Sequence, residues 1–512
     1  MNLEAEPSLE DAESARRLTG SARVRSVHVG QPKRIAIIGG GLVGALNACF
    51  FAQKGFLVDV YEYRADIRST EKAVGRSINL ALSFRGRAAL KAVGLEDYVV
   101  SEGIPMRARM IHDTNESTHE VPYGIFPDQF IISIDRRRLN EVMLSLAEKY
   151  KELVTLHFHH KLIKVDLYSG AMKFVTEDGS TVERSADLVM GCDGAYSAVR
   201  QAMMKQSLFD YSQEFIEHGY IELETPPNGC GEYAMPPNFL HIWPRDTFML
   251  IALPNLDHSF TTTLFMPFRK FEELTTEAQV LAFFRDTFPD ALKIIGESNL
   301  VQSFLSTKPS SLISIKCKPY HVGRTVILGD AAHAMVPFYG QGMNAGFLDC
   351  LVFHELMDSL DCDIDLVLPA FTERMLPNSH AIIDLAMYNY IEMRHLVNTW
   401  SYYLRKKIDN TLYRLFPGTW VPLYTMVTFS MTPYAECVEN RAWQDKVLRR
   451  AKWVIGISTI AVGLYWFFPR PTVNDYIVGF KEALNTWFRN VKVDRFYVTA
   501  EDPNFGTAGA WY

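Results

Sequence analysis

The chain has 512 residues, with 52 Lys and Arg against 59 Asp and Glu, so its formal net charge is −7. Hydrophobic residues make up 48% and charged residues 22%, a balance that excludes a mostly disordered or collagen-like chain. The apolar residues are not gathered into many runs of about 20, which excludes a polytopic membrane protein. The mild acidity and the lack of a long basic stripe before the C-terminal region also argue against nucleic-acid binding.

The N-terminal segment and the cysteines indicate the cellular setting. Residues 1–32 are polar, with acids first and arginines later, and we expect a disordered leader rather than a secretory signal or a transit peptide. The seven cysteines are irregularly spaced and form no C-x-x-C motif. This pattern indicates free, mostly buried thiols in a reducing compartment, and no metal site is expected.

A strand, a glycine-rich turn, a helix and a second strand follow the leader. Residues 34–38 predict a buried strand, 42–54 a helix and 57–61 a second strand. The turn contains a G-x-G-x-x-G motif formed by Gly39, Gly41 and Gly44. These glycines permit the tight turn, the approach of a pyrophosphate and close helix–strand packing. Glu62 ends the second strand, where a carboxylate can accept hydrogen bonds from ribose hydroxyls. Because the carboxylate would repel the 2′-phosphate of NADP, the sequence predicts a site for FAD or NAD.

The rest of the chain changes character twice before residue 346. Residues 206–304 alternate aromatic or β-branched residues with polar ones, which predicts an antiparallel sheet. Around residues 325–328 the buried-strand pattern returns, and from residue 346 to about 450 the pattern is helical. We therefore predict an α/β fold with an α+β insert, in which a Rossmann-like dinucleotide-binding domain carries an antiparallel-sheet substrate domain. The predicted parts are the dinucleotide-binding domain (33–205, resumed at 305–380), the substrate sheet (206–304) and a helical region (381–445).

The C-terminal part, residues 446–512, contains a run of 16 residues without a charge, 453–468. Four basic residues precede it: Lys446, Arg449, Arg450 and Lys452. The run is shorter than the usual span of about 20 residues, but snorkelling basic flanks extend the reach of such a helix. We expect a hydrophobic anchor helix that contacts the lipid bilayer. A buried core helix is the alternative, and the choice between spanning the membrane and lying in its interface stays open.

Two further motifs place acids and glycines after predicted strands. One strand ends in the turn Asp193-Gly194, and a later strand ends in Gly329-Asp330, followed by a glycine-rich helix start at 340–344. A carboxylate after a buried strand can bind a ribityl hydroxyl, and N–H groups at a helix start can hold a phosphate or the flavin pyrimidine edge. His333, on its own, is more often a structural residue than a catalytic base.

In this order and spacing the three motifs resemble the FAD-dependent aromatic hydroxylases of the p-hydroxybenzoate hydroxylase type. Within that group, the strings at 75–83, 103–110, 387–394 and 422–429 resemble the kynurenine 3-monooxygenase family. The resemblance implies bound FAD, with NADPH and O2 as co-substrates, and hydroxylation of L-kynurenine to 3-hydroxy-L-kynurenine through a flavin hydroperoxide. It also implies anchoring in the mitochondrial outer membrane with the catalytic part facing the cytosol. The oligomeric state stays open.

The resemblance assigns substrate and cofactor residues, and no side chain is expected to be catalytic because the flavin carries the chemistry. Arg109 and Tyr123, within residues 105–130, would hold the substrate carboxylate, which a guanidinium can grip with two parallel hydrogen bonds. The other implied substrate residues are Asn389, Tyr424, Glu392, Phe338 and Tyr339. The implied FAD contacts are Gly39, Gly41, Gly44, Glu62, Ala81, Arg136, Leu162, Asp330, Gly342, Met343 and Asn344.

One departure and two alternatives accompany this interpretation. Where the family's pattern has an acid pair after Gly346-Phe347, this chain has Leu348-Asp349, which puts the local packing in doubt but not the cofactor. A membrane-associated FAD-dependent lipid epoxidase or reductase shares the three motifs but should lack the Arg–Tyr pair. A non-catalytic escort-type protein on the same fold would lack a functional flavin site, and the intact motifs argue against it.

Overall fold

The structure is a computed structural model that describes residues 33–70, 79–394 and 399–467, with a few further positions between 478 and 486. The predicted leader, residues 71–78 of the family-like string and most of the tail lie outside the described residues. The chain divides into two units, residues 1–438 and 439–512, which are considered separately.

A six-stranded sheet forms the centre of the nucleotide-binding part of the first unit. Five of its strands run parallel, and only the short edge strand β18 is antiparallel. Helix α1 (Leu42–Gln53) packs on β1 and β2 and also contacts α4 (Arg136–Glu148) and α11 (Gly342–Ser359). In order across the sheet, the strands are β18 (His321–Val322), β19 (Thr325–Ile327), β12 (Leu188–Gly191), β1 (Arg34–Ile38), β2 (Leu57–Tyr61) and β8 (Val154–His157). The predicted strand–helix–strand unit is confirmed.

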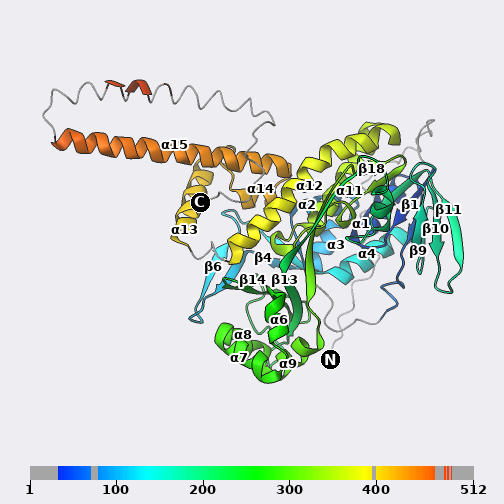
Figure 1. The fold of residues 1–512 in the computed structure, drawn as a ribbon, viewed down its shortest axis with the longest axis horizontal. Coiled ribbons are helices and arrows are strands. Elements are labelled where there is room, and N and C mark those ends of the chain that lie inside the picture. The colour runs from blue at the N-terminus through cyan, green and yellow to red at the C-terminus, as the bar shows by residue number, and fades with distance from the viewer. Residues whose placement is uncertain are drawn as a thin grey trace, which may run out of the picture. The chain divides into compact units, whose positions relative to one another are not determined.

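The second large sheet has seven strands and is antiparallel except where β14 pairs in parallel with β5. Figure 1 shows the long strand β13 running from the nucleotide-binding side toward the helices α6–α9. In order across the sheet, the strands are β17 (Ser310–Lys318), β13 (Asp210–Thr225), β16 (Phe260–Pro267), β15 (Phe248–Pro254), β14 (Phe239–Arg245), β5 (Ala108–His112) and β6 (Thr118–Pro122). The antiparallel insert predicted over residues 206–304 is thus confirmed for residues 210–267, and strands from both flanking segments extend it.

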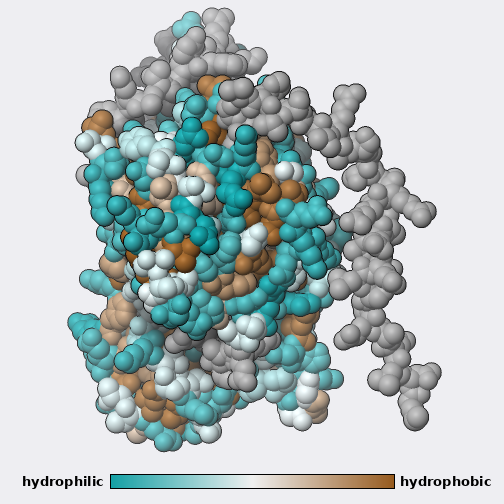
Figure 2. Space-filling model, turned by 90° about the vertical axis from the view of Figure 1, so that its right-hand side faces the viewer, coloured by the Kyte–Doolittle hydropathy of each residue, from teal (hydrophilic) through white to brown (hydrophobic). Residues whose placement is uncertain are grey.

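Helices that the sequence pattern did not predict cover one end of this sheet. A capping box of Thr276 and Gln279 starts α7, and Phe283, Phe284 and Phe288 pack with the sheet in a second hydrophobic core. The four helices are α6 (Phe268–Glu273), α7 (Glu277–Thr287), α8 (Pro289–Ile295) and α9 (Glu297–Ser306). Figure 2 shows one face of the molecule on which small hydrophobic patches alternate with hydrophilic residues, as expected when the large apolar side chains are internal.

Smaller elements complete the first unit. One three-stranded sheet has the order β3 (Asn79–Leu82), β7 (Ile131–Asp135) and β4 (Ile104–Met106). Helices α2 (Phe84–Ala92) and α3 (Glu96–Ser101) lie between β3 and β4 in the sequence. A second three-stranded sheet consists of β9 (Lys161–Val165), β10 (Ala171–Val175) and β11 (Thr181–Ser185), and α5 (Ala198–Met203) follows it. The later helices are α10 (Asp330–His333), the 3-10 helix Pro337–Tyr339, α12 (Ile364–Arg394), α13 (Trp400–Leu415) and α14 (Leu423–Phe429).

No disulfide joins any two of the seven cysteines, all of which lie among the described residues, and five of them are buried. Cys49 lies on α1 and Cys192 directly after β12, and neither side chain reaches the surface. The prediction of free, mostly buried thiols is confirmed.

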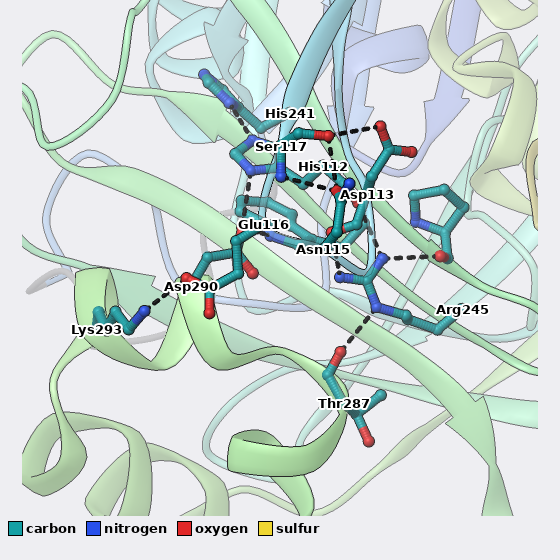
Figure 3. Close-up of polar contacts among 12 residues, drawn as sticks. His112, Asp113, Asn115, Glu116, Ser117, His241, Arg245, Thr287, Asp290 and Lys293 are labelled. Atoms are coloured by element: carbon teal, nitrogen blue, oxygen red, sulfur yellow. Dashed lines mark hydrogen bonds and ion pairs between the residues drawn. The ribbon is translucent and has the colours of Figure 1, made fainter.

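A buried chain of polar contacts joins β5, β14 and α8 (Figure 3). His112 Nε2 lies 2.9 Å from His241 Nδ1, and His112 Nδ1 lies 3.0 Å from Asp290 Oδ2. His241 Nε2 donates to the Pro236 carbonyl at 2.8 Å, and because a carbonyl only accepts, His241 Nδ1 must be the acceptor toward His112. Burial lowers the pKa of His241 to about 4, which keeps this ring neutral near pH 7.

The helix α15 (Tyr434–Phe467) carries the predicted uncharged run, except Phe468, which lies outside the described residues. Several apolar side chains of this run are exposed, among them Trp453, Ile455, Ile460 and Trp466. Within the described part of the chain, we find no helix that combines the length and the apolar character needed to cross a membrane. This finding does not support the spanning form of the predicted anchor helix.

Candidate flavin and substrate site

The glycine-rich turn between β1 and α1 leaves open space where a ligand phosphate would lie. Gly39 has a φ of +104°, and a Cβ on it would stand 2.5 Å from the Cys192 carbonyl oxygen. A Cβ on Gly44 would stand 1.9 Å from the Gly39 carbonyl oxygen, whereas a Cβ on Gly41 would meet nothing within 4 Å. No side chain caps the N-terminus of α1. The first N–H groups of α1 have no partner within the helix and lie next to the open space at Gly41, where they could bind a pyrophosphate.

Glu62 stands at the end of β2, directly against this turn. Its carboxylate accepts the Gly40 N–H at 2.9 Å and the Arg64 N–H at 3.0 Å. A carboxylate has about four lone-pair positions, so acceptor capacity remains for ribose hydroxyls. Leu162 is buried on β9, and Arg136 is the exposed first residue of α4.

The third motif is held by Asp349, the residue that remains from the family's acid pair. Asp349 Oδ2 accepts the Gly329 N–H at 2.8 Å and lies 2.6 Å from His333 Nε2. Burial alone would lower the pKa of His333, but the adjacent Asp349 carboxylate raises it above its ordinary value. This buried pair fixes the turn that presents the exposed Asp330. His333 is therefore a structural residue of the motif, and Leu348-Asp349 retains the carboxylate that the packing needs.

Asn344 uses its whole side chain within the protein. Its Oδ1 accepts the Ser83 N–H, and its Nδ2 donates to the carbonyls of Ala81 and Gly340, each at 2.8 Å. These bonds place Ala81 against the Gly340 turn. What remains open to a cofactor is the backbone: the N–H groups of Gly342, Met343 and Asn344 lie in the first turn of α11 and have no partner within the helix. The open turn, the carboxylate of Glu62 and these N–H groups together fit FAD.

Arg109 on β5 is a buried cation with an unmet donor. The side chain is 6% exposed, and its guanidinium carbon lies 4.8 Å from the centre of the Tyr424 ring and 5.7 Å from that of Tyr123. Neither Arg109 Nε nor the Tyr123 hydroxyl has a hydrogen-bond partner among the described residues, although both atoms are buried. Burial raises the pKa of Tyr123 well above its ordinary value, so the hydroxyl stays a donor. Two buried donors without an acceptor form a site for an anion.

A row of parallel aromatic rings leads from Arg109 to the flavin-side turn, which is the turn at Gly340 that precedes α11. The Tyr123 and Tyr424 rings are 5.5 Å apart with an 8° angle between them, and Tyr424 and Tyr339 are 5.6 Å apart at 11°. Tyr339 directly precedes the Gly340 turn that contacts Ala81. The row therefore connects the anion-binding end with the backbone N–H groups of α11.

The remaining predicted substrate residues lie on or against α12. Asn389 Nδ2 donates to the Phe338 carbonyl at 2.7 Å, and the Phe338 ring stacks on Tyr390 at 3.9 Å. Asn389 thus holds the 3-10 helix that contains Phe338 and Tyr339. Glu392 is half-buried and receives a hydrogen bond from another helix, α13.

Comparison with known proteins gives the family. A family model described as an FAD binding domain matches residues 33–358. The kynurenine 3-monooxygenase of Anopheles gambiae is 54% identical over 433 residues, which cover 84% of this chain and 89% of that protein. The enzyme of the same name from Sus scrofa is 50% identical over 464 residues, covering 90% and 98%. This chain belongs to the kynurenine 3-monooxygenase family.

Solved structures share the fold of this kynurenine 3-monooxygenase family member. PqsL of Pseudomonas aeruginosa, solved with 2-aminobenzoylacetate, is 18% identical with a TM-score of 0.59, covering 71% of this chain and 96% of that chain. The 2-methyl-3-hydroxypyridine-5-carboxylic acid oxygenase is also 18% identical, with a TM-score of 0.58 and coverages of 72% and 95%. The FAD-binding monooxygenase fold is thereby confirmed.

Two further residues of this family member line the site but were not predicted from the sequence. Tyr402 and Lys406 lie one turn apart on α13, and with Arg109 and Pro122 they line a cavity of about 140 Å³. The Tyr402 hydroxyl donates to Glu392 Oε1 at 3.3 Å. Burial, assisted by repulsion from Arg109, lowers the pKa of Lys406 to about 8. The i, i+4 spacing of a Tyr and a Lys within the helical region was the only available signal, and it is common on solvated helices.

Proposed function

We propose that this protein is an FAD-dependent, NADPH-consuming monooxygenase that hydroxylates L-kynurenine to 3-hydroxy-L-kynurenine. The observation that carries the proposal is the pair of buried, unmet donors on Arg109 and Tyr123 at the end of the aromatic row. Kynurenine has the matching chemistry, with an amino-acid carboxylate at one end and an aromatic amine at the other. The names of the relatives support the same substrate.

Each polar group of the site has a role in this proposal. Arg109 grips the carboxylate with parallel hydrogen bonds, and the Tyr123 hydroxyl donates a further one. Glu392 attracts the substrate ammonium, and Lys406 adds positive charge on the carboxylate side. The rings of Tyr424 and Tyr339 hold the substrate ring beside the turn that starts α11 and exclude water from it. Bound FAD, reduced by NADPH, supplies the chemistry that transfers an oxygen atom from O2 to the ring.

Turnover of the FAD-loaded protein tests the proposal. NADPH oxidation is measured with and without L-kynurenine, and 3-hydroxy-L-kynurenine is quantified. We expect kynurenine to stimulate oxidation and to yield the hydroxylated product. Oxidation without this product, together with turnover of a squalene-like or prenyl lipid, would instead favour the lipid epoxidase or reductase. A protein that retains no flavin would favour the escort-type alternative.

A variant pair locates the substrate site within the same assay. Arg109→Ala should weaken kynurenine use far more than FAD retention. Arg107→Ala is the matched control, because Arg107 lies two residues away and is exposed, and its side chain donates to the Pro127 carbonyl and lies over the Phe130 ring. Equal loss of FAD and of kynurenine use in Arg109→Ala would mean that Arg109 stabilises the fold and does not bind the substrate.

We also propose that α15 contacts a lipid bilayer, with the mitochondrial outer membrane as the expected location and the catalytic part on the cytosolic side. Trp453 and Trp466 are 74% and 81% exposed, and basic residues precede the apolar run, a composition typical of helices that lie in a membrane interface. The double variant Trp453→Glu, Ile460→Glu should lose flotation with phosphatidylcholine–phosphatidylserine vesicles. Unchanged flotation would contradict the proposal. The exposed Leu415 in the first unit provides the control substitution Leu415→Glu.

A further inference from the structure

Arg85 is a fully buried arginine that forms no ion pair with any carboxylate in the described part of the chain. It lies on α2 and donates to backbone carbonyls instead. Its Nε donates to the Val427 carbonyl at 2.9 Å, and its Nη2 donates to the carbonyls of Met426 and Thr432. A charge without a carboxylate partner is costly to bury, so its position calls for a physical reason.

The carbonyls that Arg85 contacts lie at and just beyond the C-terminal end of α14. The last carbonyls of a helix have no partner within the helix and carry the negative end of its dipole. A cation there donates hydrogen bonds to these carbonyls and also interacts favourably with the dipole. Helix α14 spans only Leu423–Phe429 and presents Tyr424, the middle ring of the aromatic row, from its first turn. Arg85 therefore holds the short helix that positions a substrate-side ring.

The other side of Arg85 is joined to the flavin-side turn. Helix α2 begins after Ser83, whose N–H is accepted by Asn344 Oδ1 on α11. The Arg85 guanidinium lies 4.0 Å from the centre of the Tyr434 ring, and the Tyr434 hydroxyl donates to Gln341 Oε1 at 3.1 Å. Gln341 is the N-cap of α11. Two contact paths thus connect Arg85 to the first turn of α11.

We propose that Arg85 is a positioning residue that fixes Tyr424 relative to the N-terminus of α11, and so sets the placement of the substrate ring against the flavin. The proposal rests on the proposed function for its kinetic consequence. If the ring is displaced, NADPH, H⁺ and O2 are converted to NADP⁺ and H2O2 without hydroxylation. A displacement of about 1 Å can lower a rate by about 100-fold, so a modest shift of α14 is sufficient.

The test uses Arg85→Lys in the FAD-loaded full chain. Lysine keeps the charge but carries its three N–H donors on one nitrogen, so it cannot reproduce the planar fork in which Nε and Nη2 reach separate carbonyls. We expect FAD content to stay unchanged, the product formed per NADPH to fall on the order of tenfold, and H2O2 to rise by the missing amount. Arg87→Lys is the matched control, because Arg87 lies on the same helix and forms its ion pair with Glu96 of α3, a half-buried contact. This control should behave as the unmodified protein does.

A spectroscopic measurement makes the result independent of turnover. With 3-fluorotyrosine at position 424, the ¹⁹F signal of the FAD-loaded protein should shift or broaden in Arg85→Lys and stay in place in Arg87→Lys. An unchanged signal together with unchanged coupling would overturn the inference, even if the protein hydroxylates kynurenine. A displaced signal in a protein that makes no 3-hydroxy-L-kynurenine would leave the positioning role standing and overturn the proposed function.

Tyr434→Phe covers the case in which Arg85→Lys does not fold. It removes only the hydroxyl that contacts Gln341 and leaves the ring beneath the guanidinium. We expect a smaller loss of coupling in the same direction, with FAD retained. Full coupling in a folded Tyr434→Phe variant, with the ¹⁹F signal of position 424 unmoved, would contradict the connection between Arg85 and α11.

Discussion

The Tyr123 hydroxyl gives a test in which stability and binding should change in opposite directions. It is buried, and no described residue accepts its hydrogen bond. An unsatisfied buried polar group costs about 1–3 kcal/mol. Replacing Tyr123 by Phe removes that group while keeping the ring that stacks on Tyr424, so the substrate-free protein should become more stable by about 1 kcal/mol or more.

The same substitution removes a donor that the substrate carboxylate would use. A hydrogen bond to a charged group contributes about 1.5–3 kcal/mol, which corresponds to an increase of about 10- to 150-fold in the Kd for L-kynurenine. Stability is measured by denaturant unfolding of the FAD-loaded protein without substrate. The Kd is measured by titrating L-kynurenine against the flavin absorbance, and FAD content serves as the check that the cofactor site is intact.

Tyr413→Phe is the control for this pair of measurements. Tyr413 is also buried, but its hydroxyl accepts a hydrogen bond from Gln129 at 3.2 Å. Its removal should therefore lower the free energy of unfolding by about 1 kcal/mol and leave the Kd within about twofold. The reasoning is refuted if Tyr123→Phe destabilises the protein as Tyr413→Phe does while the affinity for kynurenine stays the same.

Three further predictions concern the cofactor turn and two perturbed pKa values. Gly41→Ala should leave the stability of the FAD-free protein unchanged, since its Cβ meets open space, but should lower FAD retention, which dialysis and absorbance will show. The pKa of Lys406 is about 8, so kynurenine binding should weaken as the pH rises through that value; Lys406→Met should bind more weakly near neutral pH and lose this pH dependence. The pKa of His241 is lowered to about 4, so the unfolded chain takes up a proton first as the pH falls below 6.5. Stability should therefore be complete above about pH 6.5 and fall by about 2 kcal/mol between pH 7 and pH 5, and the urea midpoint of His241→Gln should show a smaller drop over that range.

Local patterns predicted the nucleotide-binding half well, because its chemistry is contiguous in sequence. The strand, turn and helix around Gly39 form one continuous segment, and Glu62 follows at the end of the next strand. In residues 268–306, by contrast, the strand-like pattern of the preceding sheet obscured four helices. Phe283 and Phe284 are aromatic residues that favour strands by propensity, and here tertiary packing against the sheet decides for helix.

The candidate site was only partly accessible from sequence, for a related reason. Family resemblance pointed to Arg109, Tyr123 and Tyr424, and the structure brings these three together from segments about 300 residues apart. Arg85 could not be predicted in this way, because its partners are backbone carbonyls, which leave no signature in the side chains. Asn344 shows the converse: its position matched a cofactor contact, yet its side chain is occupied by Ser83, Ala81 and Gly340.

The buried guanidinium of Arg109 also explains how one site can select its substrate. A guanidinium does not lose its proton in proteins, so Arg109 remains charged in the substrate-free state even though burial opposes this. An anionic group such as a carboxylate can satisfy Arg109 Nε and the Tyr123 hydroxyl together. An apolar lipid would fill the aromatic row but leave both donors unsatisfied, and sites built to bond a polar group reject analogues without it by about 10⁴–10⁵-fold. The two donors that lower the stability of the substrate-free protein are therefore the groups that discriminate an amino-acid substrate from a lipid.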